Sequence, residues 1–70
     1  MPEVIAYEIH VRDVLDEKWA NHFFPFTLRP GDEDTLLTGI VHDQAELFGV
    51  LLKIRDLGLN LVSVNPVVLE

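Results

Sequence analysis

The segment from Val41 to Val64, VHDQAELFGVLLKIRDLGLNLVSV, constrains the fold more than any other part of the chain. Asp43 can accept a backbone N–H at a helix start, and Glu46, three residues later, completes the acidic form of a capping box. Gly58 suits the left-handed position that ends a helix, and the apolar run after it is typical of a strand. The segment therefore predicts a helix over 44–57 and a strand over 59–64.

The N-terminal segment has the period-2 pattern of a half-buried strand over residues 4–12. Its apolar face consists of Ile5, Tyr7, Ile9 and Val11. Its other face consists of Ala6, Glu8, His10 and Arg12. We predict that the apolar face packs against helices and that the other face is open.

In the middle of the chain, the spacing of the apolar residues changes from the period of a strand to that of a helix. Leu15, Trp19 and Phe23 are spaced at i, i+4 and i+8, which predicts a helix from Asp13 to Phe24 that ends before Pro25. Residues 26–29 then form a short strand, 30–34 an acidic turn and 35–41 the returning strand of a hairpin. Asn65-Pro66 ends the last strand and leaves an apolar tail over 66–70.

This order of elements, β-α-β-β-α-β, predicts an α+β fold. The ferredoxin-like sandwich satisfies it with four antiparallel strands in the order 4-1-3-2 and both helices on one face of the sheet. The 70 residues make a single domain, with a core over about 4–65.

Charge and composition exclude several classes of function. Twelve acidic against five basic residues give a net charge of −7, which repels phosphate backbones and anionic membranes, so we expect neither nucleic-acid nor membrane partners. The chain has no cysteine, which removes disulfides and thiolate metal sites. The N-terminal MPEVIAYEIH lacks the basic region of a secretory signal, and we expect a cytoplasmic protein.

The residues that often carry chemistry do not form a recognisable site. His10, His22 and His42 do not pair with one another at i, i+3 or i+4, and the acidic turn Asp32–Asp34 lacks the ligand spacing of a calcium loop, so we expect no metal or cofactor. Glu8, His10 and Arg12 share the open sheet face, either as an acid–base cluster or, as we favour, as charges that keep this face soluble or pair across an oligomer seam. We predict no catalytic residue.

Apolar residues make up 49% of this small chain, and the helix over 44–57 carries them over a broad arc. Its predicted core stripe consists of Leu47, Leu51, Ile54 and Leu57. The arc exceeds what one sheet face can cover, which predicts a homo-oligomer, most simply a two-fold dimer. The predicted interface consists of Phe48, Val50, Leu52, Val67, Val68 and Leu69.

The stretches YEIHVRDVLDEKWANHF and TLLTGIVHDQAELFGVLLKIRDLGLNLVSV resemble a family of small bacterial proteins of no assigned function. The family pattern is Y-E-I-x-V-x-G-x-L-D-x-x-W-A-x-W-F, a turn, and T-x-L-x-G-x-V-x-D-Q-A-x-L-x-G-L-L-x-K-I-R-D-L-G-L-x-L-x-S-V. The chain departs from it at Asp13, where a glycine is usual, and at His22, where an aromatic residue is usual. The resemblance covers about residues 7–64 and implies a stand-alone domain or small oligomer.

Two other resemblances define alternatives to a non-catalytic, self-associating interaction or ligand-binding module. GVLLKIRDLGLNLVSV resembles the helix–strand unit of ACT regulatory domains, which implies an amino-acid sensor, although here the unit follows the third strand instead of the first. Met1-Pro2 is similar to the start of small tautomerases, which use an N-terminal proline as a base, although their basic substrate-holding residue is missing here.

Overall fold

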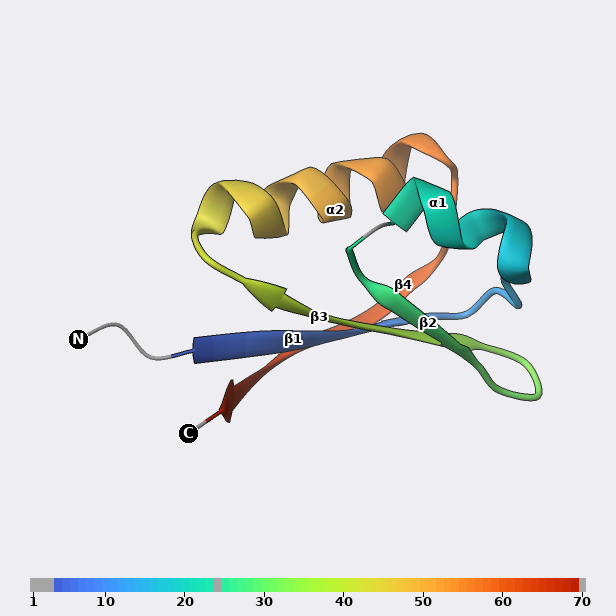
Figure 1. Cartoon of the computed structure of the whole chain (residues 1–70). Helices are drawn as coiled ribbons and strands as arrows, with labels where there is room; N and C mark the ends of the chain where they lie inside the picture. The colour runs from blue at the N-terminus through green and yellow to red at the C-terminus, as the bar shows by residue number, and fades with distance from the viewer. Residues whose placement is uncertain (1–3, 24, 70) are drawn as a thin grey trace.

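The structure, a computed structural model, describes residues 4–23 and 25–69, with only the backbone at residues 4, 68 and 69. Within these residues, four β-strands, one 3-10 helix and two α-helices follow one another (Figure 1). In order they are β1 (Val4–Val11), η1 (Glu17–Trp19), α1 (Ala20–Phe23), β2 (Thr27–Pro30), β3 (Thr35–Val41), α2 (Gln44–Asp56) and β4 (Leu61–Leu69).

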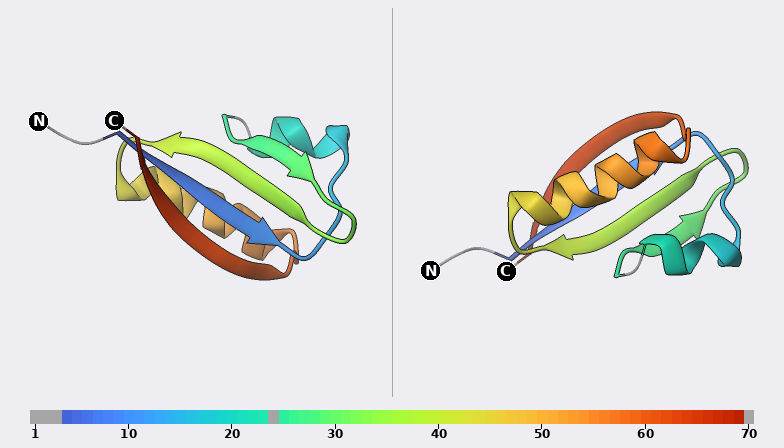
Figure 2. Two further views of the ribbon diagram at one scale, coloured as in Figure 1. Left: turned by 90° about the horizontal axis from the view of Figure 1, so that it is seen from below. Right: turned by 90° about the horizontal axis from the view of Figure 1, so that it is seen from above.

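The strands form one antiparallel sheet in the order β2-β3-β1-β4, and the helices lie on one face of it (Figures 1 and 2). The predicted α+β class and the predicted pairing of β2 with β3 are confirmed. Seen from above, α2 lies along β1, whereas α1 lies towards β2 (Figure 2). Among the described residues, no helix lies on the opposite face of the sheet.

The predicted alternation of β1 is confirmed by burial. Ile9 and Val11 are fully buried on the helix side, and Tyr7 packs against the same core. Glu8 and His10, on the other face, are half-buried, whereas Ala6, which was also assigned to that face, is only 6% exposed. One face of β1 is therefore sealed by the helices while the other stays partly open to solvent.

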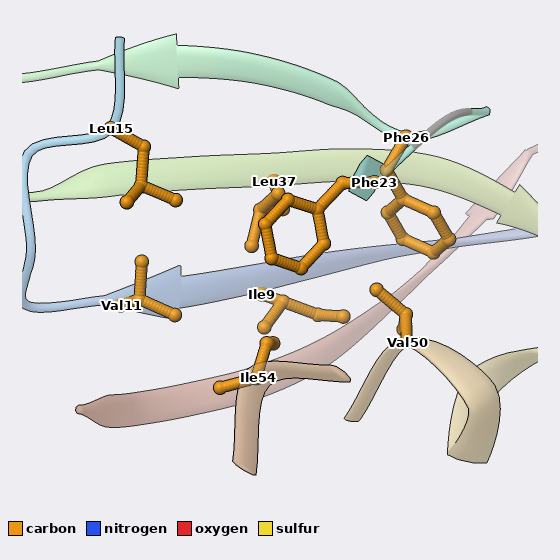
Figure 3. Packing of buried hydrophobic residues seen from close by; sticks show 8 residues of the cluster. All are labelled: Ile9, Val11, Leu15, Phe23, Phe26, Leu37, Val50 and Ile54. Carbon is orange, nitrogen blue, oxygen red and sulfur yellow. The ribbon is translucent and has the colours of Figure 1, made fainter. Parts of the chain in front are cut away.

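The core lies between the sheet and the helices and draws side chains from every layer (Figure 3). Its buried members are Ile9, Val11, Leu15, Phe23, Phe26, Leu37, Val50 and Ile54. Phe26 packs over Gly39 of β3, where an added Cβ would lie only 2.8 Å from the ring. Glycine is therefore required at this position of the strand because the ring occupies the space of a side chain.

The prediction of a helix from Asp13 to Phe24 is wrong in its first half, and its predicted last residue, Phe24, lies outside the described residues. The chain leaves β1 as a loop, and the helical segment begins only after Asp16, whose carboxylate accepts the Lys18 N–H at 3.0 Å. Asp13 does not start a helix because it holds distant segments: its carboxylate accepts the Asn60 N–H at 2.8 Å, and its carbonyl accepts the Thr35 hydroxyl at 2.7 Å. Tertiary contacts override the local helical pattern here.

The prediction that Asn65-Pro66 ends the last strand is also wrong. β4 continues to Leu69, and its backbone pairs with β1, with Pro66 opposite Tyr7 and Val67 opposite Ala6. β4 is an edge strand, so one side of it needs no sheet partner, and a proline is tolerated where its nitrogen faces that side. The residues expected to form a tail are thus part of the sheet.

The end of α2 follows the prediction. Gly58 has a φ of 72° and donates to the Arg55 carbonyl at 3.0 Å, while Leu59 donates to the Ile54 carbonyl at 3.1 Å. This pair of hydrogen bonds is the Schellman motif, which satisfies the last carbonyls of the helix and turns the chain towards β4.

Gly58→Ala is expected to lower the free energy of unfolding by about 1–2 kcal/mol, because an L-residue is strained at this positive φ. No atom lies within 4 Å of the added Cβ, so the cost is conformational and not steric. Gly49→Ala, inside α2 and also without neighbours, is the control and should raise stability by about 0.5–1 kcal/mol. Urea denaturation followed by circular dichroism measures both. Equal effects of the two substitutions would contradict the assignment.

Candidate interaction surface

Hydrogen bonds at the start of α2 fix the orientation of the helix. Asp43 is the N-cap, and its carboxylate accepts the Glu46 N–H at 2.9 Å, as predicted. The Glu46 carboxylate reaches back one residue further than a capping box requires: it accepts the His42 N–H at 2.5 Å and lies 3.0 Å from His42 Nδ1. The hydrogen bond from the His42 backbone, followed by that from its ring, lowers the pKa of Glu46 below its ordinary value.

This lowered pKa predicts a pH dependence of stability. Because the Glu46 carboxyl binds protons more weakly in the folded state, its contribution is fully present above the ordinary pKa of a glutamate and is lost as the pH falls through the lowered value. Denaturant unfolding of the wild type and of Glu46→Gln should therefore differ most at neutral pH and converge in acid. A difference that stayed constant with pH would show that Glu46 acts by some means other than its charge.

α2 carries two apolar stripes on opposite sides. Each has the spacing i, i+3, i+4, i+7 that places four side chains in one row along a helix. The inner stripe consists of Leu47, Val50, Leu51 and Ile54, all buried or packed against the core. The outer stripe consists of Ala45, Phe48, Gly49 and Leu52, all exposed.

The outer stripe is the largest departure of α2 from an ordinary amphipathic helix. Phe48 is 56% and Leu52 is 47% exposed, and no atom lies within 4 Å of a Cβ built on Gly49. A surface helix normally directs polar side chains to solvent on this side. The outer stripe therefore offers apolar area that the fold of one chain leaves uncovered.

The predicted interface residues divide into three groups. Phe48 and Leu52 are exposed, whereas Val50 is 6% exposed and belongs to the core, so its place in the predicted interface is wrong. The predicted core stripe included Leu57 and left out Val50, whereas Leu57 is the C-cap of α2 and is 40% exposed. Val67 is half-buried within β4; the side chains of residues 68 and 69 lie outside the described part of the structure.

A shallow hollow runs beside the outer stripe, between α2 and the segment that follows α1. It is lined by Phe23, Pro25, Phe26, Ile40, Glu46, Gly49, Val50 and Lys53. Glu46 and Lys53 thus lie on the same flank of α2. Lys53 Nζ donates to the His22 carbonyl at 2.8 Å, which holds the ammonium group on this flank.

The predicted polar cluster of Glu8, His10 and Arg12 does not come together as one site. His10 Nε2 contacts the Asp34 carboxylate, and these two residues line a depression together with Arg12, Glu33 and Val62. Glu8 lies in a different depression, beside Thr27, Arg29, Leu36 and Thr38. His10 therefore pairs with a residue of the acidic turn and not with its neighbours on β1.

The other residues considered for catalysis or metal binding lie at the surface or outside the described residues. His22 is exposed, with its ring centroid 5.6 Å from that of Trp19. Asp32 and Glu33 are exposed on the turn before β3. Within residues 4–23 and 25–69, no three His, Asp or Glu side chains are grouped as a metal site would require. Pro2, the base of the tautomerase alternative, lies outside the described residues.

The fold and this surface define a small α+β domain, a four-stranded antiparallel sheet with two helices on one face and an exposed apolar stripe on α2. The chain belongs to the family described as Domain of unknown function (DUF8691), whose model matches residues 6–65. No curated protein and no solved structure matches the chain. None of the described helices combines the length and the apolar character needed to cross a membrane.

Proposed function

We propose that this protein is a non-catalytic interaction module that associates with itself. The observation that carries the proposal is the outer stripe of α2, which keeps Phe48 and Leu52 in solvent although the inner stripe already supplies the core. Apolar area of this kind on a small domain is stabilised when a second protein surface covers it.

The hydrogen bonds of the titratable residues support a non-catalytic role. Asp43 caps α2, Asp13 joins the loop after β1 to Asn60, and Asp16 caps η1. His10 is engaged by Asp34. These side chains stabilise the fold, and a structural role is sufficient to account for each of them.

The strand order β2-β3-β1-β4 with helices on one face supports a ferredoxin-like arrangement, in which the second sheet face is also free for contacts. We further propose a cytoplasmic location. The net charge of −7 supports protein partners in preference to nucleic acids or membranes.

Self-association is tested by sedimentation equilibrium or by size exclusion with light scattering, on the full chain from ~10 µM to ~1 mM, the range that suits a small interface. The proposal expects the mass to rise from 8.0 kDa towards twice that value as the concentration increases. A constant mass of one chain over this whole range would overturn it.

An ACT-like sensor of small molecules such as amino acids is the second candidate. It is favoured by a hollow that apolar and polar side chains line together, namely Ile5, Tyr7, Val41, Leu47, His42, Asp43 and Gln44. A thermal-shift panel of amino acids and common metabolites tests this function. A true ligand at a hundred times its dissociation constant stabilises the protein by about 2.7 kcal/mol, and no shift with any compound would count against a sensor.

A further inference from the structure

We propose that two copies of this chain pair through the outer stripe of α2, with the two helices antiparallel and crossing between Phe48 and Gly49. This inference rests on the self-association proposed above and adds the surface and the orientation. The partner is a second copy of the same chain, arranged about a two-fold axis, so that the same surface is used on both sides.

The shape of the outer stripe favours a helix as its partner. Phe48 and Leu52 project from the stripe, whereas Ala45 and Gly49 leave low points between them. A Cβ built on Gly49 meets no atom within 4 Å, so the backbone of a second helix can approach closely there. Side-chain ridges of one helix then fit into the grooves of the other. In the antiparallel arrangement Ala45 of one copy lies opposite Leu52 of the other.

The charges on α2 favour a second copy and fix its direction. Glu46 lies near the start of the helix and Lys53 near its end, and both line the same hollow. The two-fold axis of an antiparallel pair brings this flank of one copy against the same flank of the other. Glu46 of each copy then lies near Lys53 of its partner. A parallel two-fold pair would instead place this flank of the two copies on opposite sides of the interface, where Glu46 and Lys53 do not meet.

The electrostatic state of these residues is consistent with that pairing. Glu46 is ionised at neutral pH, as an exposed glutamate ordinarily is, and the hydrogen bonds from His42 lower its pKa further. Arg55 is paired with Asp56 at 3.0 Å and lies about 200° around the helix from Lys53, so Lys53 is the cation of α2 on the same flank as Glu46. Antiparallel packing also brings the positive end of each helix macrodipole beside the negative end of the other.

The size of the surface predicts weak, reversible pairing. α2 has 13 residues and is about 20 Å long at 1.5 Å per residue. One helix of this length covers less than the ~800 Å² per partner of a standard interface. We therefore expect pairing that depends on concentration and responds strongly to a single substitution in the stripe.

The first test compares Phe48→Asp with Val14→Asp by sedimentation equilibrium. The two side chains are equally exposed, at 56% and 57%, but Val14 lies in the loop after β1 and not on α2. We expect at least a tenfold loss of association for Phe48→Asp and none for Val14→Asp. Circular dichroism shows whether each variant is folded. If the wild type associates and the folded Phe48→Asp variant associates equally well, this inference is overturned. The proposed self-association would then remain intact.

The second test measures orientation by cross-linking, which is straightforward because the natural chain has no cysteine. Under mild oxidation, a mixture of Ala45→Cys and Leu52→Cys should give a disulfide between the two variants, because positions 45 and 52 of different copies face each other. Either variant alone should give little dimer, since identical positions are then about 10 Å apart along the helix axis. Efficient dimerisation of Ala45→Cys alone would show parallel pairing and refute the proposed orientation.

The third test addresses the charges. Lys53→Glu should weaken association because it places two carboxylates together in each half of the pair. Combining it with Glu46→Lys should restore much of the loss, since attraction is recovered with the signs exchanged. If the double variant associated no better than Lys53→Glu, the pairing of these two residues would be wrong.

Discussion

Phe23→Ala is expected to lower the free energy of unfolding by about 3–5 kcal/mol, which is the typical cost of emptying a buried aromatic site. Phe23 is 1% exposed and lies at the end of the four-residue helix α1, where it contacts the sheet and anchors the helix to it (Figure 3). A chain of 70 residues has a modest stability, so a large fraction of the molecules should unfold at room temperature.

Urea denaturation followed by far-UV circular dichroism measures this effect. Phe48→Ala removes the same atoms from an exposed position and is the matched control. In dilute solution, where the chain is a monomer, the control should change stability by no more than about 0.5 kcal/mol. If the two substitutions had equal effects, Phe23 would not be part of the core.

Thr35→Val is expected to have the second largest effect, although it barely changes the volume of the side chain. Thr35 is fully buried, and its hydroxyl accepts the Leu15 N–H at 2.9 Å and donates to the Asp13 carbonyl at 2.7 Å. Valine cannot form either hydrogen bond, and each buried backbone group left without a partner costs about 1–3 kcal/mol. The loop after β1 should therefore loosen.

Two measurements separate this effect from a general loss of packing. The amide proton of Leu15 should exchange with solvent much faster in Thr35→Val than in the wild type. Thr38→Val, on the same strand but on the half-buried open face, should change stability by less than about 1 kcal/mol. Thr35→Ser, which keeps the hydroxyl, should preserve the protection of Leu15. Unchanged exchange at Leu15 in Thr35→Val would contradict the role of the hydroxyl.

The elements that the sequence predicted well are those whose limits are set by local signals. The strand of the N-terminal segment ends within one residue of its predicted limit, and α2 begins at Gln44 as its cap at Asp43 indicated. The end of α2 was also predictable because Gly58 supplies a conformation that few other residues adopt. For these two elements, the spacing of the apolar residues and the capping residues were sufficient to predict where the element begins or ends.

The errors occurred where distant parts of the chain decide the local structure. The loop at Asp13 is held by Thr35 and Asn60, which are far away in sequence, so the local periodicity could not exclude a helix there. The spacing of Leu15 and Phe23 nevertheless identified two core residues, because both side chains point inward from whatever backbone carries them. The prediction placed Val50 outside the core because α2 carries apolar residues on two sides. Composition alone therefore does not show which side of the helix faces the sheet.

The prolines of the two edge strands have a consequence for how copies of this protein can accumulate. Pro30 belongs to β2 and Pro66 to β4, and neither residue has the N–H that a newly added strand would need to bind. Each border of the sheet therefore contains one position without a backbone donor. A crowded solution of this acidic protein should consequently give discrete, closed assemblies and resist conversion into fibrils.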